Sequence, residues 1–319
     1  MNAELHIDLA SIRAAEARIR ALAHRTPVMT SRSFNAEAGL AAFFKCENFQ
    51  RGGSFKIRGA SNFIFSLTPE ELDRGIVTYS SGNHAQAVAI AAEAAGARAT
   101  IVMPLDAPRS KVDATRAHGA TIVTYDRYRE SREAIGRKIA EETGAVLVPP
   151  YDHPWTIAGQ GTTALELLED IPDLDALLAP VGGGGLLAGC SIAAKSLHPS
   201  IRIFGAEPEL ANDTYLSFEA GRRIEIPVPT TIADGLRATQ PGEITFPILE
   251  EHIEGVLLVS EEEIKEAVKF FFSRLKIVVE PSGAVAAAAV LFRRLPPGVE
   301  RAGVILSGGN MDLELLATF

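Results

Sequence analysis

The chain has 319 residues, 47% of them hydrophobic and 22% charged, so it carries enough apolar side chains to bury a core and is not a disordered chain. At about 150 residues per domain, this length favours two domains or one large one. The formal net charge of −9 at pH 7 argues against a surface for nucleic acid or anionic membranes, because such surfaces need clustered basic residues, and favours a small-molecule partner.

The N-terminal segment, residues 1–22, has Glu4 and Asp8 where a secretory signal would carry basic residues, and its pattern predicts an amphipathic helix. The longest apolar run, residues 284–292, is far shorter than the roughly 20 residues of a membrane span. The two cysteines occur in dissimilar contexts without the spacing of a metal site. We therefore expect a cytoplasmic protein without disulfide bonds or membrane-spanning helices.

From Gly75 onward, short runs rich in Val, Ile and Leu alternate with longer Ala-rich stretches of helical period. This alternation is typical of parallel sheets covered by helices and predicts an α/β fold. The predicted strands are Ile76–Tyr79, Thr100–Met103, Thr121–Thr124, Val146–Val148, Ala176–Pro180, Arg202–Ala206, Val256–Val259 and Val304–Leu306.

Two polar, Pro-containing stretches interrupt the periodic segments, and they predict hinges near residues 67–74 and 149–154. A run of alternating strands and helices lies between them. We therefore expect a small domain of residues 75–150 inserted into a large domain, which residues 1–66 and 151–319 form.

Lys56 directly follows the turn Gly52-Gly53-Ser54-Phe55 and begins a stretch of helical period. A lysine held among apolar neighbours is partly desolvated, which lowers its pKa and leaves some free amine for a Schiff base. The alternative is an exposed lysine on a helix face. The reactive interpretation is favoured by a phosphate-binding segment elsewhere in the chain.

The strand Ile76–Tyr79 ends in the small polar residues Ser80, Ser81, Gly82 and Asn83, and a helix of alanines follows. Hydroxyl and backbone N–H groups at a helix start suit a carboxylate, and an asparagine amide can donate to a ring oxygen. A serine that only caps the helix is the structural alternative.

Four consecutive glycines, Gly182, Gly183, Gly184 and Gly185, follow the strand Ala176–Pro180 and open an apolar helix. Their backbone can curl so that bare N–H groups face an anion, and the helix N-terminus adds its positive dipole end. The segment therefore predicts a phosphate site. A turn that merely allows close packing is the plainer alternative, although four glycines would then raise the entropy of the unfolded chain without gain.

The same glycines fit a rival motif. Gly183-x-Gly185-x-x-Ala188 matches the dinucleotide-binding fingerprint, and Glu207 follows at the end of the next strand, where an acid would bind a ribose. This alternative is weakened by the position of the motif deep in the chain, and it leaves the other segments without a role.

The strand Val304–Leu306 is followed by Ser307-Gly308-Gly309-Asn310, which puts a hydroxyl at the carboxyl edge of a sheet. In open α/β sheets that edge binds ligands.

Together these segments resemble the serine racemase and serine/threonine dehydratase family of pyridoxal-phosphate enzymes, which includes threo-3-hydroxyaspartate ammonia-lyases. The matching motifs lie in family order and at family spacing over nearly the whole chain, and they are Ser54–Ala60, Ser80–His84, Gly182–Gly185 and Ser307–Asn310. The resemblance implies the tryptophan-synthase-β fold, fold type II, with two open, mainly parallel twisted sheets and flanking helices. It also implies a cofactor cleft between a large and a small domain, and a homodimer.

The resemblance further implies the cofactor site. Lys56 would hold pyridoxal phosphate as a Schiff base, Phe55 would lie beside the ring, and Asn83 would bond the ring hydroxyl oxygen. The four glycines and Leu186 would bind the phosphate. Ser307 would face the ring nitrogen, where a neutral hydroxyl moderates the electron sink and favours β-elimination.

On the substrate side, the resemblance points to Ser80, Ser81, His84 and Arg132. Ser81 would lie on the cofactor face opposite Lys56; relatives that only deaminate threonine commonly have alanine there. Racemisation needs an acid on each face, so Ser81 makes it chemically possible. Arg132 aligns with an arginine near the substrate and would favour a second carboxylate, although helix-face solvation explains it as well.

A metal site is implied by the match of residues 207–213 to the racemase site for Mg²⁺ or Ca²⁺, with Mn²⁺ as a further candidate. Glu207 and Asp213 would supply carboxylates and Ala211 a backbone carbonyl, which are the hard oxygen ligands these ions prefer. A solvated acidic helix start is the alternative.

Some positions depart from the family pattern. Tyr79 stands where mammalian-type racemases have histidine, and Ala238 where they have a substrate-contacting serine. Arg51-Gly52 replaces the Lys-Thr pair that helps to bind a nucleotide activator, which argues against activation by ATP. The chain ends soon after Asn310, so we expect no C-terminal regulatory domain.

The sequence therefore predicts a pyridoxal-phosphate lyase that converts serine, threonine or threo-3-hydroxyaspartate into a 2-oxo acid and ammonia. An amino-acid racemase that uses Lys56 and Ser81 as a two-face acid/base pair is the first alternative. A non-catalytic or nicotinamide-binding protein is the second.

Overall fold

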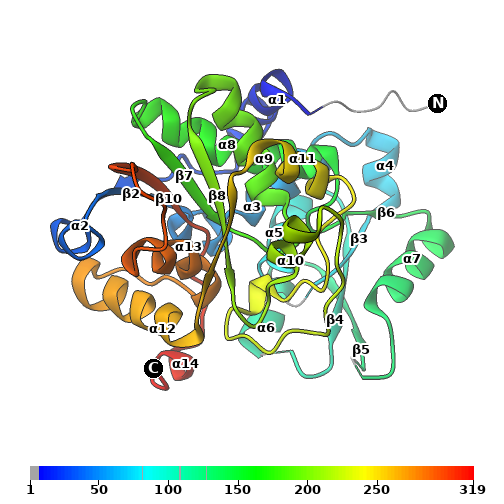
Figure 1. Cartoon of the computed structure of the whole chain (residues 1–319). Helices are drawn as coiled ribbons and strands as arrows, with labels where there is room; N and C mark the ends of the chain where they lie inside the picture. Colours follow the sequence, from blue (N-terminus) through cyan, green and yellow to red (C-terminus); the bar gives the residue numbers. More distant parts are fainter. Residues whose placement is uncertain (1–6, 81, 108, 127) are drawn as a thin grey trace.

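The computed structural model describes residues 7–80, 82–107, 109–126 and 128–319. Two sheets form the framework, a six-stranded one and a four-stranded one, and in Figure 1 they lie on the left and on the right. Helices cover both. The predicted α/β fold with two open, mainly parallel sheets is confirmed.

The six-stranded sheet is parallel except at one edge, where β1 pairs antiparallel with β2. Its strands, in spatial order, are β1 (Val28–Met29), β2 (Ala41–Cys46), β10 (Arg301–Leu306), β7 (Ala176–Pro180), β8 (Arg202–Pro208) and β9 (Gly255–Val259). Strands β1 and β2 were not among the predicted strands. The apolar run of β2 contains Lys45, a charged residue whose side chain is fully buried.

The four-stranded sheet is parallel throughout. Its strands, in spatial order, are β5 (Thr121–Tyr125), β4 (Ala99–Pro104), β3 (Ile76–Tyr79) and β6 (Val146–Leu147). All eight strands that the sequence predicts are present in the two sheets; β3 and β7 have the predicted bounds, and the ends of the others differ by one to three residues.

The helices are α1 (Leu9–Ile19), α2 (Arg32–Ala38), α3 (Lys56–Ile64), α4 (Pro69–Arg74), α5 (Asn83–Ala94), α6 (Arg109–Ala117), α7 (Arg132–Thr143), α8 (Pro154–Asp170), α9 (Gly185–Leu197), α10 (Asp213–Ala220), α11 (Thr245–His252), α12 (Glu261–Phe270), α13 (Pro281–Leu291) and α14 (Leu313–Leu316). None of the helices described is long and apolar enough to cross a membrane.

Successive side chains of the central strands enter opposite layers of the core, as a pleated sheet requires. In β7, Ala176 and Leu178 join one buried cluster, and Leu177 and Ala179 join the other. Helices α12 and α13 contribute to the first cluster, and α1, α8 and α9 to the second. The sheet is thus covered on both faces, which explains its continuous apolar strands.

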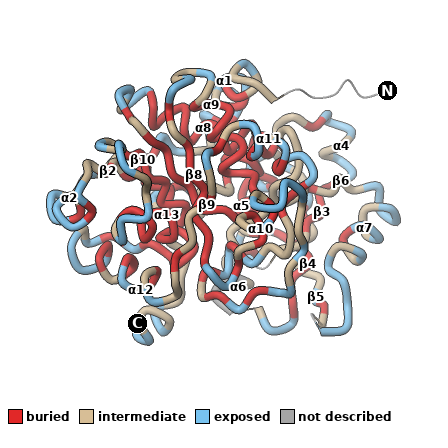
Figure 2. Tube along the Cα trace, in the orientation of Figure 1, coloured by how far each residue is buried: buried red, intermediate tan, exposed pale blue. Residues whose placement is uncertain are grey.

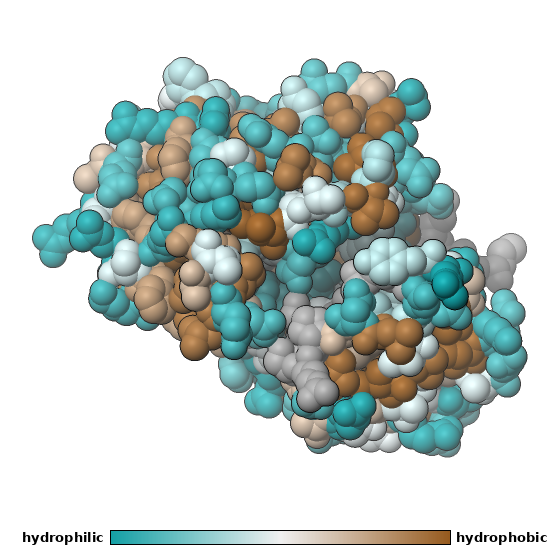
Figure 3. Space-filling view, turned by 90° about the horizontal axis from the view of Figure 1, so that it is seen from below, coloured by the Kyte–Doolittle hydropathy of each residue, from teal (hydrophilic) through white to brown (hydrophobic). Residues whose placement is uncertain are grey.

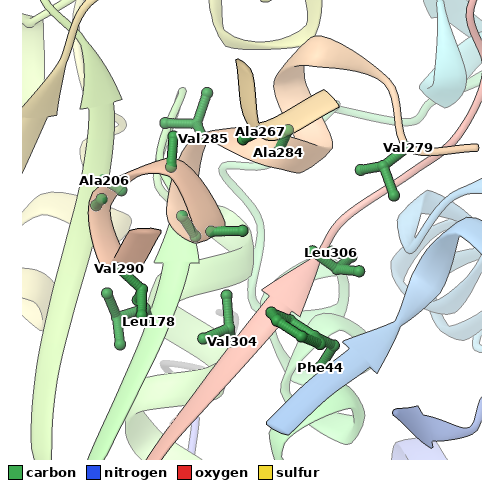
Figure 4. Packing of buried hydrophobic residues seen from close by; sticks show 14 of the residues in the cluster. Phe44, Leu178, Ala206, Ala267, Val279, Ala284, Val285, Val290, Val304 and Leu306 are labelled. Carbon is green, nitrogen blue, oxygen red and sulfur yellow. The ribbon is translucent and has the colours of Figure 1, made fainter. Parts of the chain in front are cut away.

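Helix α13 is buried over nearly its whole length, because its small side chains let it lie close to the sheet. Figure 4 shows Val290 beside Leu178 of β7, and Ala284 and Val285 close to Ala267 of α12. In Figure 2 the buried residues are concentrated in the strands and in the inner helices, and the exposed ones lie on the outer helices and loops.

Helix α3 packs into the core of the small sheet. Its apolar residues Ile57, Ala60, Phe63 and Ile64 belong to one cluster with residues of α5 and of the four-stranded sheet. The predicted boundary at residue 66 assigns this helix to the large domain. Helix α3 also packs on α8 of the large domain, where the Gly59 N–H donates to Gln160, so the predicted boundary stays a prediction.

The predicted hinge near residues 67–74 contains a helix. Thr68 caps α4 in a capping box with Glu71, and Pro69 occupies the first turn, where it needs no N–H partner. Proline and polar residues mark a helix start here rather than a loop. The other predicted hinge, residues 149–154, connects β6 to α8.

Candidate active site

The segments that carry the sequence motifs lie beyond the carboxyl ends of strands of both sheets. They are Ser54–Lys56 after β2, Ser80–His84 after β3, Pro150–Tyr151 after β6, Gly182–Gly185 after β7 and Ser307 after β10. Ligands bind at this edge in open parallel sheets. In the space-filling view of Figure 3, the surface is hollowed between the part that contains α12 and the part that contains β4 and β5.

Lys56 is the first residue of α3, and its side chain is only partly exposed. The amine Nζ donates to the carbonyl oxygen of Pro150 at 2.9 Å and lies 5.1 Å from the centre of the Phe55 ring. Burial lowers the pKa of the Lys56 amine to about 8. Lys56 therefore has the weakly basic amine that the sequence predicts.

The glycine loop, Gly182–Gly185, connects β7 to α9 and lies against Tyr151. A Cβ on Gly183 would come within 2.3 Å of the Tyr151 ring, and one on Gly184 within 2.7 Å of the Thr245 hydroxyl. Gly184 also has φ of 91°, which favours glycine. Within the described part of the chain, the backbone N–H groups of Gly182, Gly183 and Gly184 donate to no other group.

These unpaired N–H groups lie at the start of the 13-residue helix α9, whose dipole favours a negative charge there. The residues therefore fit an anionic group such as the cofactor phosphate. Because Pro150 contacts Lys56 and the adjacent Tyr151 contacts the glycine loop, the amine and the loop border the same space.

Asn83 is held on both sides of its amide. Its Nδ2 donates to Oε1 of Glu280 at 2.7 Å, and its Oδ1 accepts from Nδ2 of Asn310 at 3.0 Å. Asn310 also donates to the carbonyl oxygen of Gly52 at 2.7 Å. This network fixes the amide orientation and leaves the second N–H of Asn83 for a ring oxygen.

Ser307 lies at the end of β10 and is 3% exposed, so its hydroxyl is enclosed by the site. The N–H of Phe55 donates to the Ser307 carbonyl oxygen at 3.0 Å, and Ser54 bridges to Gly308. The Ser307 hydroxyl bonds to none of the other described residues. The backbone of Ser307 thus lies beside Phe55, and the role of its hydroxyl at the ring nitrogen stays a prediction.

His84 is buried in the first turn of α5, and burial together with the charge of Lys56 lowers its pKa to about 3. Its Nε2 lies 3.3 Å from the carbonyl oxygen of Val148. Since a carbonyl only accepts, we assign the proton to Nε2, which leaves Nδ1 as an acceptor without a partner among the described residues.

Of the two serines before α5, Ser80 lies within the described residues. The Ser80 hydroxyl accepts the N–H of Gly82 at 3.3 Å, so it shapes the turn into the helix. Ser81, the predicted second catalytic residue, lies outside the described residues.

Arg132 begins α7 and already has partners. Its Nε donates to Oε1 of Glu133 at 2.8 Å, and its guanidinium lies 5.8 Å from the centre of the Tyr79 ring. Its side chain is 47% exposed, so helix-face solvation and a substrate contact are both compatible with its position.

Two of the predicted metal ligands, Glu207 and Asp213, are neighbours at the carboxyl end of β8. Glu207 is fully buried, and its carboxylate accepts the N–H groups of Thr214 at 3.1 Å and Tyr215 at 2.8 Å. Asp213 is also fully buried, and neither of its carboxylate oxygens bonds to a described residue. Burial and the neighbouring Asp213 raise the pKa of Glu207 well above its usual value.

Burial of two adjacent carboxylates costs free energy unless a cation compensates for their charge. The burial of Glu207 beside Asp213 therefore fits a bound metal ion. Within the described ranges, however, no group of three or more His, Cys, Asp or Glu side chains comes together. A site here would need backbone oxygens as well, as the prediction for Ala211 supposes.

Three residues of the site carried no predicted role. Tyr151 packs on the glycine loop, while Glu280 and Asn310 orient Asn83. Asn310 belongs to a quoted motif, and its position after a glycine pair at a strand end was an available signal. Tyr151 and Glu280 reach the site through the fold, and nothing in their local sequence indicates it.

Comparison with known proteins identifies the family. Residues 19–308 match the family model described as pyridoxal-phosphate dependent enzyme. The chain belongs to this family. Membership agrees with the weakly basic Lys56 and the open glycine loop, and it excludes the dinucleotide alternative, in which Glu207 would bind a ribose rather than cap α10.

The chain is 49% identical to the L-threo-3-hydroxyaspartate ammonia-lyase of Saccharomyces cerevisiae, over 95% of this chain and 93% of that protein. It is 46% identical to the serine racemase of Schizosaccharomyces pombe, over 97% and 95% of the two chains. The solved structure of maize serine racemase matches with a TM-score of 0.94 and 48% identity, over 98% of this chain and 96% of that one.

Proposed function

We propose that the chain is a pyridoxal-phosphate dependent ammonia-lyase that converts a β-hydroxy amino acid into a 2-oxo acid and ammonia. The observation that carries the proposal is the weakly basic amine of Lys56. Residues 150–151 connect it to a glycine loop whose backbone N–H groups have no acceptor among the described residues. This pairing suits a cofactor with an aldehyde at one end and a phosphate at the other. Similarity to an ammonia-lyase supports the choice of reaction.

The cofactor would be held by residues of both sheets. They are Phe55, Lys56, Asn83, Gly182, Gly183, Gly184, Gly185, Leu186 and Ser307. When bound, pyridoxal phosphate supplies a sink for the negative charge that develops at the substrate Cα. The neutral Ser307 hydroxyl would face the ring nitrogen without forcing its protonation.

Lys56 would move the proton at the substrate Cα. With a pKa of about 8, its amine exchanges a proton near neutral pH, which is what a general base and acid requires. The carbonyl oxygen of Pro150 orients the amine. The β-hydroxyl would take up a proton and leave as water, which gives an enamine; hydrolysis by one water then gives the 2-oxo acid and ammonia.

The substrate carboxylate would lie at the start of α5. The first-turn N–H groups of this 12-residue helix and the Ser80 hydroxyl offer donors, and the helix dipole favours the negative charge. His84 stays neutral because of its lowered pKa, so its Nδ1 offers an acceptor there rather than a charge.

Serine, threonine and threo-3-hydroxyaspartate are the proposed substrates. The Arg132 guanidinium would bind the second carboxylate of hydroxyaspartate. To do so it would have to leave its ion pair with Glu133. The identity to an L-threo-3-hydroxyaspartate ammonia-lyase supports this last substrate.

A divalent cation, Mg²⁺ or else Ca²⁺ or Mn²⁺, would complete the acidic pocket at the end of β8. Glu207 and Asp213 would provide carboxylate oxygens and Ala211 its carbonyl oxygen. The support is that both Asp213 oxygens are buried without a partner among the described residues. Bound near α10, such an ion would stabilise the fold around the site rather than react.

Racemisation is the second candidate function. The identity to two serine racemases supports it, since 46% and 48% are similar to the identity with the lyase. Ser81 would serve as the acid on the face opposite Lys56.

Two further properties are proposed. A homodimer is supported by the exposed apolar side chains of Phe49, Phe272 and Val278. The segments of Phe49 and Val278 meet where Asn48 donates to the carbonyl oxygen of Val278 at 3.0 Å. Cys46 and Cys190 are free and buried, which supports a reducing compartment such as the cytoplasm.

The test is a product assay on the purified protein with pyridoxal phosphate. Pyruvate, 2-oxobutyrate, oxaloacetate and D-isomers are quantified separately from L-serine, L-threonine and L-threo-3-hydroxyaspartate, with Mg²⁺ and with a chelator. We expect 2-oxo acid from at least one substrate, a visible cofactor absorbance band, and loss of both in Lys56→Ala. A colourless protein that releases no 2-oxo acid contradicts the proposal.

The same assay separates the two functions. If the chain racemises, Ser81→Ala abolishes the D-isomers while 2-oxo acid release survives. Equal loss of both activities counts against a separate role for Ser81. A chelator that leaves activity and thermal stability unchanged counts against the metal site.

A further inference from the structure

The carbonyl group of Gly183 in the glycine loop is held from the side of α11. It accepts the Thr245 hydroxyl at 2.7 Å and the N–H of Gly242 at 3.3 Å. Thr245 is the first residue of α11 and is fully buried. A loop of glycines is otherwise free to rotate its peptide planes, so these two bonds restrict it where it is weakest.

Holding this carbonyl also orients the next N–H group. The peptide between Gly183 and Gly184 is trans, so its C=O and N–H point in opposite directions. With the carbonyl oxygen turned toward α11, the N–H of Gly184 is turned to the opposite side of the loop. That N–H is one of those without an acceptor among the described residues.

The start of α11 is itself held by Asp152, which lies in the predicted hinge between β6 and α8. Its carboxylate accepts the N–H groups of Glu243 at 2.8 Å, Ile244 at 2.9 Å and Thr245 at 3.2 Å. A Cβ on Gly242 would come within 2.2 Å of this carboxylate, so only glycine allows the approach. A charged cap at a helix N-terminus is favourable.

Two contacts therefore connect the predicted hinge to the glycine loop. Tyr151 packs its ring on Gly183, and the adjacent Asp152 fixes α11 and, through Thr245, the Gly183 carbonyl. Tyr151 thus contacts the glycine loop directly, and Asp152 orients the loop through α11.

We propose that Thr245 is a positioning residue for the phosphate of the cofactor, because its hydroxyl holds the glycine loop with the Gly184 N–H free, and that Asp152 supports it by capping α11. This inference rests on the proposed function, since it assumes that the loop binds the phosphate. It adds two residues that carry no motif and touch no ligand themselves.

The experiment compares two ligands that differ only in the phosphate. Apoprotein of the wild type, Thr245→Val, Thr245→Ser and Asp152→Asn is titrated with pyridoxal phosphate and with pyridoxal, and the dissociation constants are read from the visible absorbance. Valine keeps the shape of threonine without the hydroxyl, and serine restores it. The ³¹P resonance of bound pyridoxal phosphate provides a second readout.

We expect Thr245→Val to weaken the binding of pyridoxal phosphate roughly 3–10-fold, as the loss of one neutral hydrogen bond implies. The dissociation constant of pyridoxal should change by less than about 2-fold. Thr245→Ser should bind both ligands like the wild type. Asp152→Asn should weaken pyridoxal phosphate selectively but less. The ³¹P resonance should shift in the valine variant and return in the serine variant.

The inference is overturned if Thr245→Val weakens the binding of both ligands equally. It is also overturned if neither Thr245→Val nor Asp152→Asn weakens the binding of pyridoxal phosphate. If the valine variant does not fold, Asp152→Asn decides, because its side chain lies near the surface. The proposed function fails differently: wild-type protein would then bind neither ligand with a visible absorbance band.

Discussion

The reaction that we propose depends on Lys56, whose amine is unusual because it is buried. Burial lowers its pKa to about 8, whereas a solvated lysine titrates near 10.5. The amine must be neutral to attack an aldehyde, so the lowered pKa increases the reactive fraction at neutral pH. The neutral amine that would react with the cofactor aldehyde is thus already present in the protein without cofactor.

Cofactor uptake by the apoprotein should therefore depend on pH in a defined way. We expect the rate constant for uptake of pyridoxal phosphate to rise until the pH passes about 8 and then to level off, because the amine is neutral above its pKa. Stopped-flow absorbance at a series of pH values measures this rate, and Lys56→Ala gives the background. A rate that keeps rising tenfold per pH unit toward pH 10 would show an ordinary, solvated lysine.

At this scale the sequence carries signals for the residues that we propose to touch the cofactor, but not for the residues that orient them. Lys56, the glycines and Ser307 stand in motifs whose chemistry is readable. Glu280 and Thr245 act through contacts with residues far away in the chain, so local spacing carries no sign of them.

Helix α8 begins at the predicted hinge, and its N-cap is a histidine. Nδ1 of His153 accepts the N–H of Trp155 at 3.2 Å, and the ring packs 4.6 Å from that of Phe63. Burial lowers the pKa of His153 to about 4. Protonation of Nδ1 would remove the acceptor and charge the partly buried ring.

The stability of the protein should therefore fall as His153 becomes protonated. Between pH 6.5 and about 4 the unfolded state binds a proton that the folded state does not, so the free energy of unfolding decreases as the pH drops. We expect a loss of about 1–2 kcal/mol, after allowing for partial exposure of the ring. Urea unfolding at pH values across this window measures it.

His153→Asn is the matched control, because asparagine caps helices well and does not titrate. We expect this variant to retain most of its stability at neutral pH and to lose about 1–2 kcal/mol less than the wild type on acidification. Parallel pH profiles for the two proteins would show that other groups cause the loss.

Among the elements, the strands of parallel β-α repeats are predicted well, since each is a short apolar run of its own. The exceptions have physical reasons. In β2, Lys45 interrupts the apolar pattern; its amine is buried against Glu166, which lies in α8. In α4, the capping box of Thr68 and Glu71 is a readable start signal, but the proline between them was interpreted as part of a hinge.

For the whole molecule, α3 is the element that joins the two sheets. Its apolar face packs into the core of the small sheet, while its Arg58 points into the large part of the chain. The Arg58 guanidinium makes paired hydrogen bonds of 2.7–2.9 Å with Glu47 and with Glu166. Lys56 is two residues away, so the same helix carries the reactive amine.

Removal of this guanidinium should destabilise the entire fold. The Arg58 side chain is 1% exposed, and after Arg58→Met the buried Glu47 and Glu166 would, among the described residues, keep an ion pair only between Glu166 and the Lys45 amine. An uncompensated buried charge costs about 3–5 kcal/mol, so we expect a loss of that size in the free energy of unfolding. Chemical denaturation of the apoprotein measures it.

Arg25→Met is the matched control, because Arg25 also pairs with two carboxylates of α8, Glu169 and Asp170, but is 47% exposed. Water replaces an exposed partner at little cost, so we expect a change below about 1 kcal/mol. Similar losses in both variants would mean that burial of the Arg58 cluster does not decide its contribution. A large difference instead ties the orientation of α3, and with it the position of the Lys56 amine, to charges that only the folded chain brings together.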